Sequence, residues 1–448
     1  ILRCLVGSEM CIRDSDFSIL DTTVPEHERG TFNAFTRNHS RGMRHLQRLS
    51  AAGLSHIHLL PAFDIASVNE DRSQQVSIDT DLSILAPNSA EQQAAVAAVQ
   101  NQDGFNWGYD PLHFNVPEGS YSTDPDGDQR ITEFRGMVKN LNRNGLRVVM
   151  DVVYNHTSSF GQYDQSVLDK IVPQYYHRYN TSGGLETSTC CANTASENRM
   201  MEKLMVDSLV LWAKAYKVDG FRFDIMGHHS KENILRVREA LDALTLRHDG
   251  VDGKNIYLYG EGWNFGEVAN DARFDQATQL NMAGTGVGSF DDRGRDAIRG
   301  GNPFGGYRDQ GFGTGLHTNP NGYGDDRLSE LLVLSDRTRS SLAAGLKEYA
   351  FETHTGEVRK AVDIDYFGLP TGYTDDPQEQ IAYIAAHDNE TLLDGIQAKA
   401  PDSMSIADRA RMQNFGNALI MLGQGIPFIH AGQDFLRSKS MDLSLIHI

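Results

Sequence analysis

The chain has 448 residues, of which 40% are hydrophobic and 23% charged, an ordinary globular balance with enough apolar material for a large core. Its formal net charge of −19 argues against nucleic acid or an anionic membrane surface as a partner. The sequence has no apolar run near the roughly 20 residues that cross a bilayer, and it shows no signal-sequence pattern. We therefore expect no membrane-spanning segment and a neutral ligand.

The two ends of the chain do not look like parts of a domain. Residues 1–15 contain Cys4 and Cys11, two of the four cysteines, and follow neither a helical nor a strand period. Residues 443–448 form an apolar run with no cap or turn. We expect both segments to be non-native, with residues 16–442 forming one folded unit.

From residue 42 onward, amphipathic helices alternate with short apolar strands. Two polar excursions interrupt the alternation at about 64–110 and 155–196, and residues 283–324 read as a glycine-rich irregular region. Alternating units of this kind predict a parallel sheet, and their number favours an α/β fold of the closed (β/α)8 TIM-barrel type. We expect helices at 43–52, 132–144, 201–212, 233–246, 326–349 and 409–422, and strands at 54–60, 146–154, 218–224, 255–259, 381–386 and 426–430.

The strand at 218–224 carries the first candidate for chemistry. Arg222 and Asp224 are two residues apart, so their side chains point to the same side of a strand. A nearby guanidinium favours the charged form of an acid, so we expect Arg222 to keep Asp224 ionised, as a nucleophile requires. Taken alone, the segment fits an internal Arg–Asp pair that only orders a strand end equally well.

Two further expected strands end in a carboxylate. Glu261 lies between two glycines and close to Trp263, where desolvation would raise its pKa, as a general acid requires. Asp388 lies between His387 and Asn389 and is placed to hold sugar hydroxyls. Glycoside hydrolysis uses such a carboxylate pair across the cleaved bond. Spacing alone does not show that the three acids converge, since barrel loops contain many acids.

Four short segments, in order on the expected strands, resemble the motifs of the α-amylase family of retaining glycoside hydrolases. They are DVVYNH at 151–156, DGFRFD at 219–224, YGEGW at 259–263 and AHDN at 386–389. The segments FNWGYDP at 105–111 and MGHH at 226–229, together with Cys190 and Cys191, resemble the type I pullulanases within that family. The resemblance covers roughly residues 16–442, without the flanking domains of those proteins, and it implies that the first strand and the C-terminal end of the fold are incomplete.

The resemblance implies a retaining hydrolase that cleaves α-1,6 branch linkages of pullulan and limit dextrins by double displacement. It implies that Asp224 is the nucleophile, Glu261 the acid and base, and Asp388 the stabiliser of the transition state. It also implies an α-glucan substrate, no organic cofactor, and an extracellular or cell-surface location; we expect a monomer. The implied substrate contacts are Tyr109, His156, Arg222, Trp263, His387 and Asn389.

Several alternatives stay open at this point. The chain could be another member of the family, acting on α-1,4 bonds or on glycogen branches, or a non-catalytic glucan-binding barrel. A metal-dependent hydrolase using His228, His229 and Asp224 is a third alternative. Asn155 resembles a calcium ligand of the family, and calcium is otherwise expected only weakly. Cys190 and Cys191 fit a vicinal disulfide or two loop thiols equally well.

Some residues are expected to be structural. Trp212 completes the apolar stripe of its helix, and Trp107 is given the same interpretation. His56 and His58 lie within an expected strand, where a lone histidine is more often a satisfied buried residue than a ligand.

Overall fold

The computed structural model describes residues 8–12, 17–85, 91–99, 102–104, 106–302, 306–324 and 327–439. The expected tail at 443–448, most of the leader at 1–15 and Phe105 of the pullulanase-like segment lie outside the described residues.

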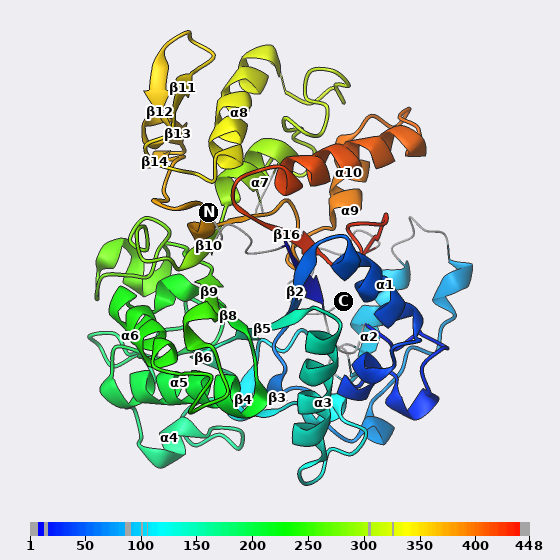
Figure 1. Ribbon diagram of the computed structural model, residues 1–448, viewed down its shortest axis with the longest axis vertical. Helices are drawn as coiled ribbons and strands as arrows, with labels where there is room; N and C mark the ends of the chain where they lie inside the picture. The colour runs from blue at the N-terminus through cyan, green and yellow to red at the C-terminus, as the bar shows by residue number, and fades with distance from the viewer. Residues whose placement is uncertain are drawn as a thin grey trace.

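The strands that carry the candidate carboxylates belong to one parallel sheet. Its strands are hydrogen-bonded in the order β1-β16-β15-β10-β9-β8-β5-β2, and the order closes on itself because β1 pairs with both β2 and β16 (Figure 1). The predicted α/β class with a parallel sheet is confirmed. The strands are β1 (Ser8–Ile12), β2 (Leu54–Leu59), β5 (Arg147–Val152), β8 (Gly220–Phe223), β9 (Tyr257–Gly260), β10 (Gly288–Phe290), β15 (Gln380–Ala382) and β16 (Ile426–His430).

Helices lie around the outside of this sheet. Between β9 and β10 the described chain has the 3-10 turns of η9 (Gly266–Asp271) in place of an α-helix, so the alternation of strand and helix is not regular throughout. None of the described helices is both long and apolar enough to cross a membrane. The helices are α1 (Arg41–Ala51), α2 (Glu91–Val99), α3 (Gln129–Arg143), α4 (Leu168–Ile171), α5 (Arg199–Leu211), α6 (Lys231–Asp242), α7 (Asp292–Arg299), α8 (Arg327–Leu342), α9 (Leu392–Lys399) and α10 (Ile406–Met421).

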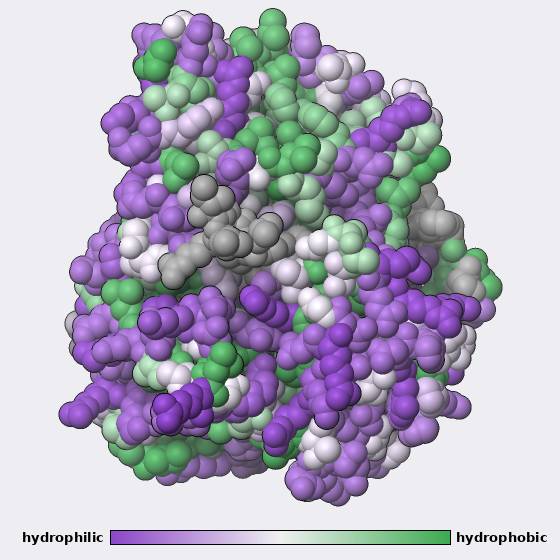
Figure 2. Space-filling model, viewed as in Figure 1, coloured by the Kyte–Doolittle hydropathy of each residue, from purple (hydrophilic) through white to green (hydrophobic). Residues whose placement is uncertain are grey.

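The core lies between the strands and the helices that follow them. The stripe predicted on the helix at 201–212 is buried: Met205 and Leu209 on α5, and Trp212 in the adjoining π-helical turn η6 (Trp212–Tyr216). The indole Nε1 of Trp212 donates to the carbonyl of Phe114 at 2.8 Å, which confirms its structural role. In contrast, α8 exposes part of its apolar face, and a band of hydrophobic residues lies over this helix in Figure 2; Leu328 and Leu332 contribute to it.

The first strand differs from the expectation. We expected residues 1–15 to leave this position of the sheet without a proper strand, but Ser8–Ile12 pair with β2 from Ser8↔Leu54 to Ile12↔Leu59 and with β16 from Glu9↔Phe428 to Cys11↔His430. The pairing uses backbone groups, which every non-proline residue supplies, so an unusual sequence can still take this place.

The chain between β9 and β16 contains elements that the sequence did not predict. The expected irregular region at 283–324 includes β10 and α7, and the helix expected at 326–349 ends at Leu342. Two hairpins follow it, β11 (Ala350–Glu352) with β12 (Val358–Lys360) and β13 (Asp365–Tyr366) with β14 (Leu369–Pro370). Helix α9 was not predicted either.

Paired strands lie at the borders of the first polar excursion and within the second. β3 (Phe63–Ile65), at the start of the first, pairs with β4 (Pro111–Pro117), which follows its expected end; in the second, β6 (His156–Thr157) pairs with β7 (Ala192–Asn193). The first excursion includes α2, which matches the short alanine-rich helix expected there. Both excursions begin at the carboxyl ends of sheet strands, the first after β2 and the second after β5, so both lie at the end of the sheet where the predicted site residues gather.

Candidate active site

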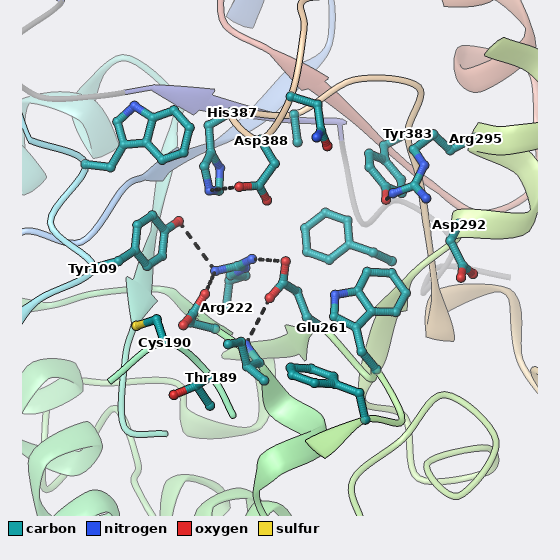
Figure 3. A pocket seen from close by; sticks show the side chains of 18 of the residues that line it. Tyr109, Thr189, Cys190, Arg222, Glu261, Asp292, Arg295, Tyr383, His387 and Asp388 are labelled. Atoms are coloured by element: carbon teal, nitrogen blue, oxygen red, sulfur yellow. Dashed lines mark hydrogen bonds and ion pairs between the residues drawn. The ribbon is translucent and has the colours of Figure 1, made fainter. Parts of the chain in front are cut away.

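A cavity of about 1150 Å3 opens at the carboxyl ends of the sheet strands (Figure 3). It is lined by the residues that follow β8, β9 and β15, namely Asp224, Glu261 and Asp388, together with parts of the excursions. The sequence could not show that these acids converge, and the structure brings all three into one cavity. Every predicted substrate-binding residue lines it as well: Tyr109, His156, Arg222, Trp263, His387 and Asn389.

Arg222 is the centre of the charged network in this cavity. Its Nη1 lies 2.9 Å from both carboxylate oxygens of Asp151 and 3.1 Å from Oδ1 of Asp224, and its Nη2 lies 2.8 Å from Oε1 of Glu261. Burial opposes its charge, yet the surrounding carboxylates hold the pKa of Arg222 well above its usual value. One guanidinium thus serves three carboxyl groups and can balance only one negative charge among them.

Asp224 is buried and held from two sides. Arg222 binds its Oδ1, and the side-chain Nδ2 of Asn155 donates to its Oδ2 at 2.8 Å and to its backbone carbonyl at 2.9 Å. Burial raises the pKa of Asp224 to about 8; the Glu261 charge adds to the rise and Arg222 opposes it. Arg222 does lower this pKa, as expected from the sequence, but burial and the Glu261 charge act in the opposite direction.

Glu261 lies directly after β9. Its Oε2 accepts a hydrogen bond from the backbone N–H of Ile225 at 3.0 Å, and Arg222 binds its other oxygen. Burial raises the pKa of Glu261, against the lowering effect of Arg222, as predicted from its surroundings in the sequence. Asp224 and Glu261 therefore both favour a proton, and one shared guanidinium joins them.

Asp388 is the most open of the three acids, with 39% of its side chain exposed. In Figure 3 it faces the same open space as Glu261. His387 lies beside it, with Nε2 3.5 Å from Oδ1 of Asp388, and burial lowers the pKa of His387 to about 4. A neutral imidazole and an open carboxylate at one position are suited to hydrogen bonds with sugar hydroxyls.

Two aromatic residues surround His387. The ring of Tyr109 stacks on it with centroids 5.2 Å apart and an interplanar angle of 18°, and Trp107 contacts it edge-on at 5.1 Å. The Tyr109 hydroxyl donates to Asp151 Oδ2 at 2.7 Å, which fixes the ring against the charged network. Trp107 was expected to be purely structural, but it lines the cavity behind His387.

The two nitrogens of His156 face protein oxygens. Nδ1 lies 2.6 Å from Oδ1 of Asn155, and Nε2 lies 2.7 Å from the carbonyl of Tyr109. Burial lowers the pKa of His156 to about 4, so the ring is neutral at ordinary pH. To make its predicted contact with a sugar, His156 must replace one of these two contacts with a hydrogen bond to a sugar hydroxyl.

The same bonds account for Asn155, the weak calcium candidate. Its amide nitrogen donates to Asp224 and its oxygen faces His156, so both polar atoms of its side chain have protein partners. Among the described residues, one group of acids close enough to share a cation is Asp64, Glu70 and Glu118. Arg130 already lies 2.6 Å from Glu70, so this group has a cationic partner.

The metal-dependent alternative is not supported. His228 Nε2 lies 3.0 Å from Ser188 Oγ, and His229 Nδ1 lies 2.9 Å from Ser196 Oγ. Neither histidine lines the cavity that contains Asp224, and no described metal-binding group includes either of them. Both imidazoles instead help to fix the loop after Asp224.

Two buried residues lie beneath the site, and sequence reasoning gave neither of them a role in it. Asp151 was quoted as part of a motif but given no role; it is fully buried, and Arg222 lowers its pKa in spite of that burial. His58 was expected to be a satisfied strand residue, which its contacts confirm: Nε2 lies 3.2 Å from Asp151 Oδ2, and Nδ1 lies 3.0 Å from the hydroxyl of Tyr259. The position of Asp151 at a strand end was the signal that could have identified it.

Glu267 on η9 connects two loops that line the cavity. It accepts hydrogen bonds from Arg178 Nη1 at 2.8 Å, from Asn193 Nδ2 at 3.0 Å and from the hydroxyl of Ser188. These bonds outweigh the effect of its burial and lower the pKa of Glu267 to about 2. Between Ser188 and Asn193 the chain carries Cys190 and Cys191, which are joined by a disulfide bond.

The comparison with known proteins agrees with this geometry. The chain is 49% identical over 434 residues to chloroplastic pullulanase 1 of Arabidopsis thaliana, a match that covers 95% of this chain and 45% of the relative. It is 42% identical over 476 residues to a pullulanase of Klebsiella pneumoniae, covering 97% of this chain and 43% of that protein. No family model matches the chain.

Solved structures give the same result. A maltotriose complex of a Klebsiella pneumoniae pullulanase superposes with a TM-score of 0.92 at 40% identity, covering 98% of this chain and 50% of that chain. The chain therefore spans about half the length of the relatives it matches, or slightly less. The resemblance to pullulanases that the sequence motifs indicated is confirmed over nearly the whole chain.

Proposed function

From its homology with pullulanases over nearly its whole length, we propose that this protein is a glycoside hydrolase that cleaves α-1,6 branch linkages in pullulan and limit dextrins. The observation that carries the proposal is the pair of acids on one guanidinium: Asp224 at 3.1 Å and Glu261 at 2.8 Å from Arg222, in a cavity lined by aromatic and polar side chains. Retaining glycosidases need such an acid and such a nucleophile.

The proposed reaction is a double displacement. Glu261 donates its proton to the glycosidic oxygen while the carboxylate of Asp224 attacks the anomeric carbon, and Glu261 then removes a proton from the water that releases the sugar. Asn155 and Arg222 fix the two oxygens of Asp224 for this attack. The negative charge left over around Arg222 is complementary to the positive charge that develops on the sugar ring.

The remaining contacts are proposed for the sugar next to the cleaved bond. Tyr109, stacked on His387, offers an aromatic face, and Asp388 offers an open carboxylate to the hydroxyl rim. His156 and Asn389 are proposed to contact the same sugar, and Trp263 to contact the substrate on the leaving-group side. All three line the cavity. No organic cofactor is needed, because the acid, the base and the nucleophile are all side chains.

We also infer a (β/α)8 barrel, supported by the closed order of eight parallel strands. We further propose that the protein acts as a monomer and that it works in an oxidising, extracellular or cell-surface setting, which the Cys190–Cys191 bond favours. Calcium stays a prediction, tested by dialysis against a chelator with the unfolding temperature as readout.

The proposal is tested by the products formed from pullulan. We expect maltotriose as the sole early product, and a loss of kcat of about 10^4-fold or more in Asp224→Asn, because the nucleophile is removed. Glu232→Gln, on the exposed face of α6, is the matched control and should keep full activity. Panose or mixed maltodextrins as early products would exclude α-1,6 specificity, and equal activity of Asp224→Asn would exclude the assigned nucleophile.

A further inference from the structure

Phe367 is a bulky residue in an unusual backbone conformation. Strands β13 and β14 form a short hairpin whose two-residue turn consists of Phe367 and Gly368, with φ angles of 51° and 85°. Turns of this type favour Asn and Gly, because a positive φ brings Cβ too close to the following carbonyl oxygen. The requirements of the turn therefore do not explain a phenylalanine at this position.

Packing does not explain the ring either. Phe367 is 75% exposed, although its neighbour Tyr366 is only 7% exposed. The ring of Phe367 contacts Tyr366, with centroids 5.0 Å apart, and the guanidinium of Arg337, 5.1 Å from its centroid. A strained backbone that presents an exposed apolar ring indicates a role outside folding.

The hairpin holds this ring in a fixed position. The hydroxyl of Tyr366 donates to Oδ2 of Asp296 at 2.7 Å, and Nε of Arg293 donates to the carbonyl of Pro370 at 3.1 Å. Both strands are thereby attached to α7, which carries Asp296 and Arg293. A ring on an anchored hairpin loses little conformational freedom when it binds a ligand.

The turn belongs to the cavity that contains the carboxylates. Tyr366 and Phe367 line it together with Glu261. Figure 3 places Arg295 across the cavity from Cys190, and Arg295 Nε donates to Oδ1 of Asp296 at 2.7 Å. Because Asp296 also binds Tyr366, the hairpin continues the side of the cavity formed by α7.

We propose that Phe367 is a sugar-binding platform that stacks on a glucose unit of the α-glucan, away from the cleaved bond, on the α7 side of the cavity. A pyranose ring has an apolar face of C–H groups, which an aromatic ring covers, while its hydroxyl rim stays available to water and polar groups. The inference rests on the proposed function and adds a substrate contact that none of the motifs contains.

The test compares three variants of Phe367. Phe367→Ala and Phe367→Asn both remove the ring, but only Asn suits a positive φ, and Phe367→Trp keeps an aromatic face. We expect the KM for pullulan to rise about tenfold in the Ala and Asn variants, the scale expected from uncovering one face of an aromatic ring. The Trp variant should stay near the wild type. Phe367→Asn should melt about 1–2 °C above Phe367→Ala, because it relieves the turn.

A binding measurement separates this inference from the proposed function. Calorimetric titration of the Asp224→Asn protein with maltohexaose, with and without Phe367→Ala, should show an increase in Kd of about tenfold (about 1.4 kcal/mol). Tyr163→Ala, an exposed aromatic outside the cavity, is the control and should change neither KM nor Kd.

Each outcome of these measurements decides the question. If the wild type does not cleave pullulan but Phe367→Ala raises the Kd for maltohexaose, Phe367 is a sugar contact and the proposed reaction is wrong. If the KM and the Kd are both unchanged without the ring, Phe367 is not a sugar contact. If the wild type neither cleaves pullulan nor binds maltohexaose, both proposals are overturned.

Discussion

At the scale of single residues, the site is governed by the competition between burial and one shared cation. Arg222 contacts Asp151, Asp224 and Glu261, and it lowers the pKa of Asp151 while the pKa values of the other two stay raised. The pKa values shift in different directions because Arg222 contacts the three acids differently. Asp151 is bound by both of its oxygens, whereas Asp224 and Glu261 each meet Arg222 with one. The proposed mechanism needs one proton on this pair, carried by Glu261, with Asp224 as the carboxylate.

This balance makes a prediction for Asp224→Asn. The pKa of Asp224 is raised from 3.8 to about 8 in the folded protein, so ionising this buried acid costs folding stability as the pH rises between those values. Asparagine is neutral at every pH. We expect the variant to melt a few degrees above the wild type at a pH of about 8.5 and to gain much less at about 5.

Thermal unfolding of both proteins across this pH range measures the effect. Glu232→Gln serves as the control, because it removes an exposed acid and should show no such pH dependence. If Arg222 instead held Asp224 ionised, as the sequence alone suggested, Asp224→Asn would destabilise the protein at neutral pH.

Much of the site could be predicted from the sequence, for a definable reason. Asp224 and Glu261 directly follow β8 and β9, Asp388 lies in the loop after β15, and parallel strands bring their carboxyl ends to one edge. The residues that were missed reach the cavity differently. Asp292 and Arg295 come from a helix that was expected to be irregular chain, and Phe367 comes from a hairpin turn within a long connection. No local period in the sequence marks such positions.

At the scale of elements, β10 shows why the central part of the chain was misread. It has three residues, Gly288–Phe290, in a stretch rich in glycine, so it shows no alternation. Gly288 is required by its neighbours: a Cβ atom there would lie 2.1 Å from the hydroxyl of Tyr257 and 3.1 Å from Cβ of Tyr259. Neighbouring side chains leave no room for a Cβ atom at this position. In the sequence alone, such a glycine cannot be told from a glycine in a loop.

The loops around the cavity depend on Glu267, which gives a second prediction. Its side chain is 8% exposed and is paired with the buried Arg178. Glu267→Gln would lose this ion pair and place an amide N–H₂ beside existing donors. We expect a loss of about 1–3 kcal/mol in the free energy of unfolding and a higher KM for pullulan, since the Ser188–Asn193 loop would loosen.

The pH dependence of this loss identifies its cause. The pKa of Glu267 is lowered from 4.5 to about 2, so its stabilising effect is present above the higher value and is lost as the pH falls toward the lower one. The difference between Glu267→Gln and the wild type should therefore shrink below a pH of about 4.5. Glu197→Gln removes the other carboxylate of Arg178, at 2.8 Å, and should leave the KM nearly unchanged. Equal KM effects in the two variants would show that Glu267 does not organise the cavity.

At the scale of the whole molecule, the sheet depends on a strand with an unusual sequence. Residues 8–12 close the ring between β2 and β16, and these two strands would otherwise present unpaired edges. The remaining strands have extensive apolar burial that fixes their positions; for example, Val148, Val149 and Met150 on β5 are all fully buried. Closure of the ring is thus supported by backbone pairing at a position where the sequence predicted no strand.

The last prediction tests that closure. Met10 pairs with Ile57 on one side and with Ile429 on the other. Met10→Pro removes a backbone donor within this ladder and should cost about 1–3 kcal/mol of unfolding free energy, while Met10→Ala keeps the donor and serves as the matched control. Amide hydrogen exchange should speed up in β2 and β16 with proline and stay slow with alanine. If both variants exchange alike, backbone pairing by residues 8–12 does not hold the two edges together, and the stability of the sheet must come from its other strands and the helices packed on them.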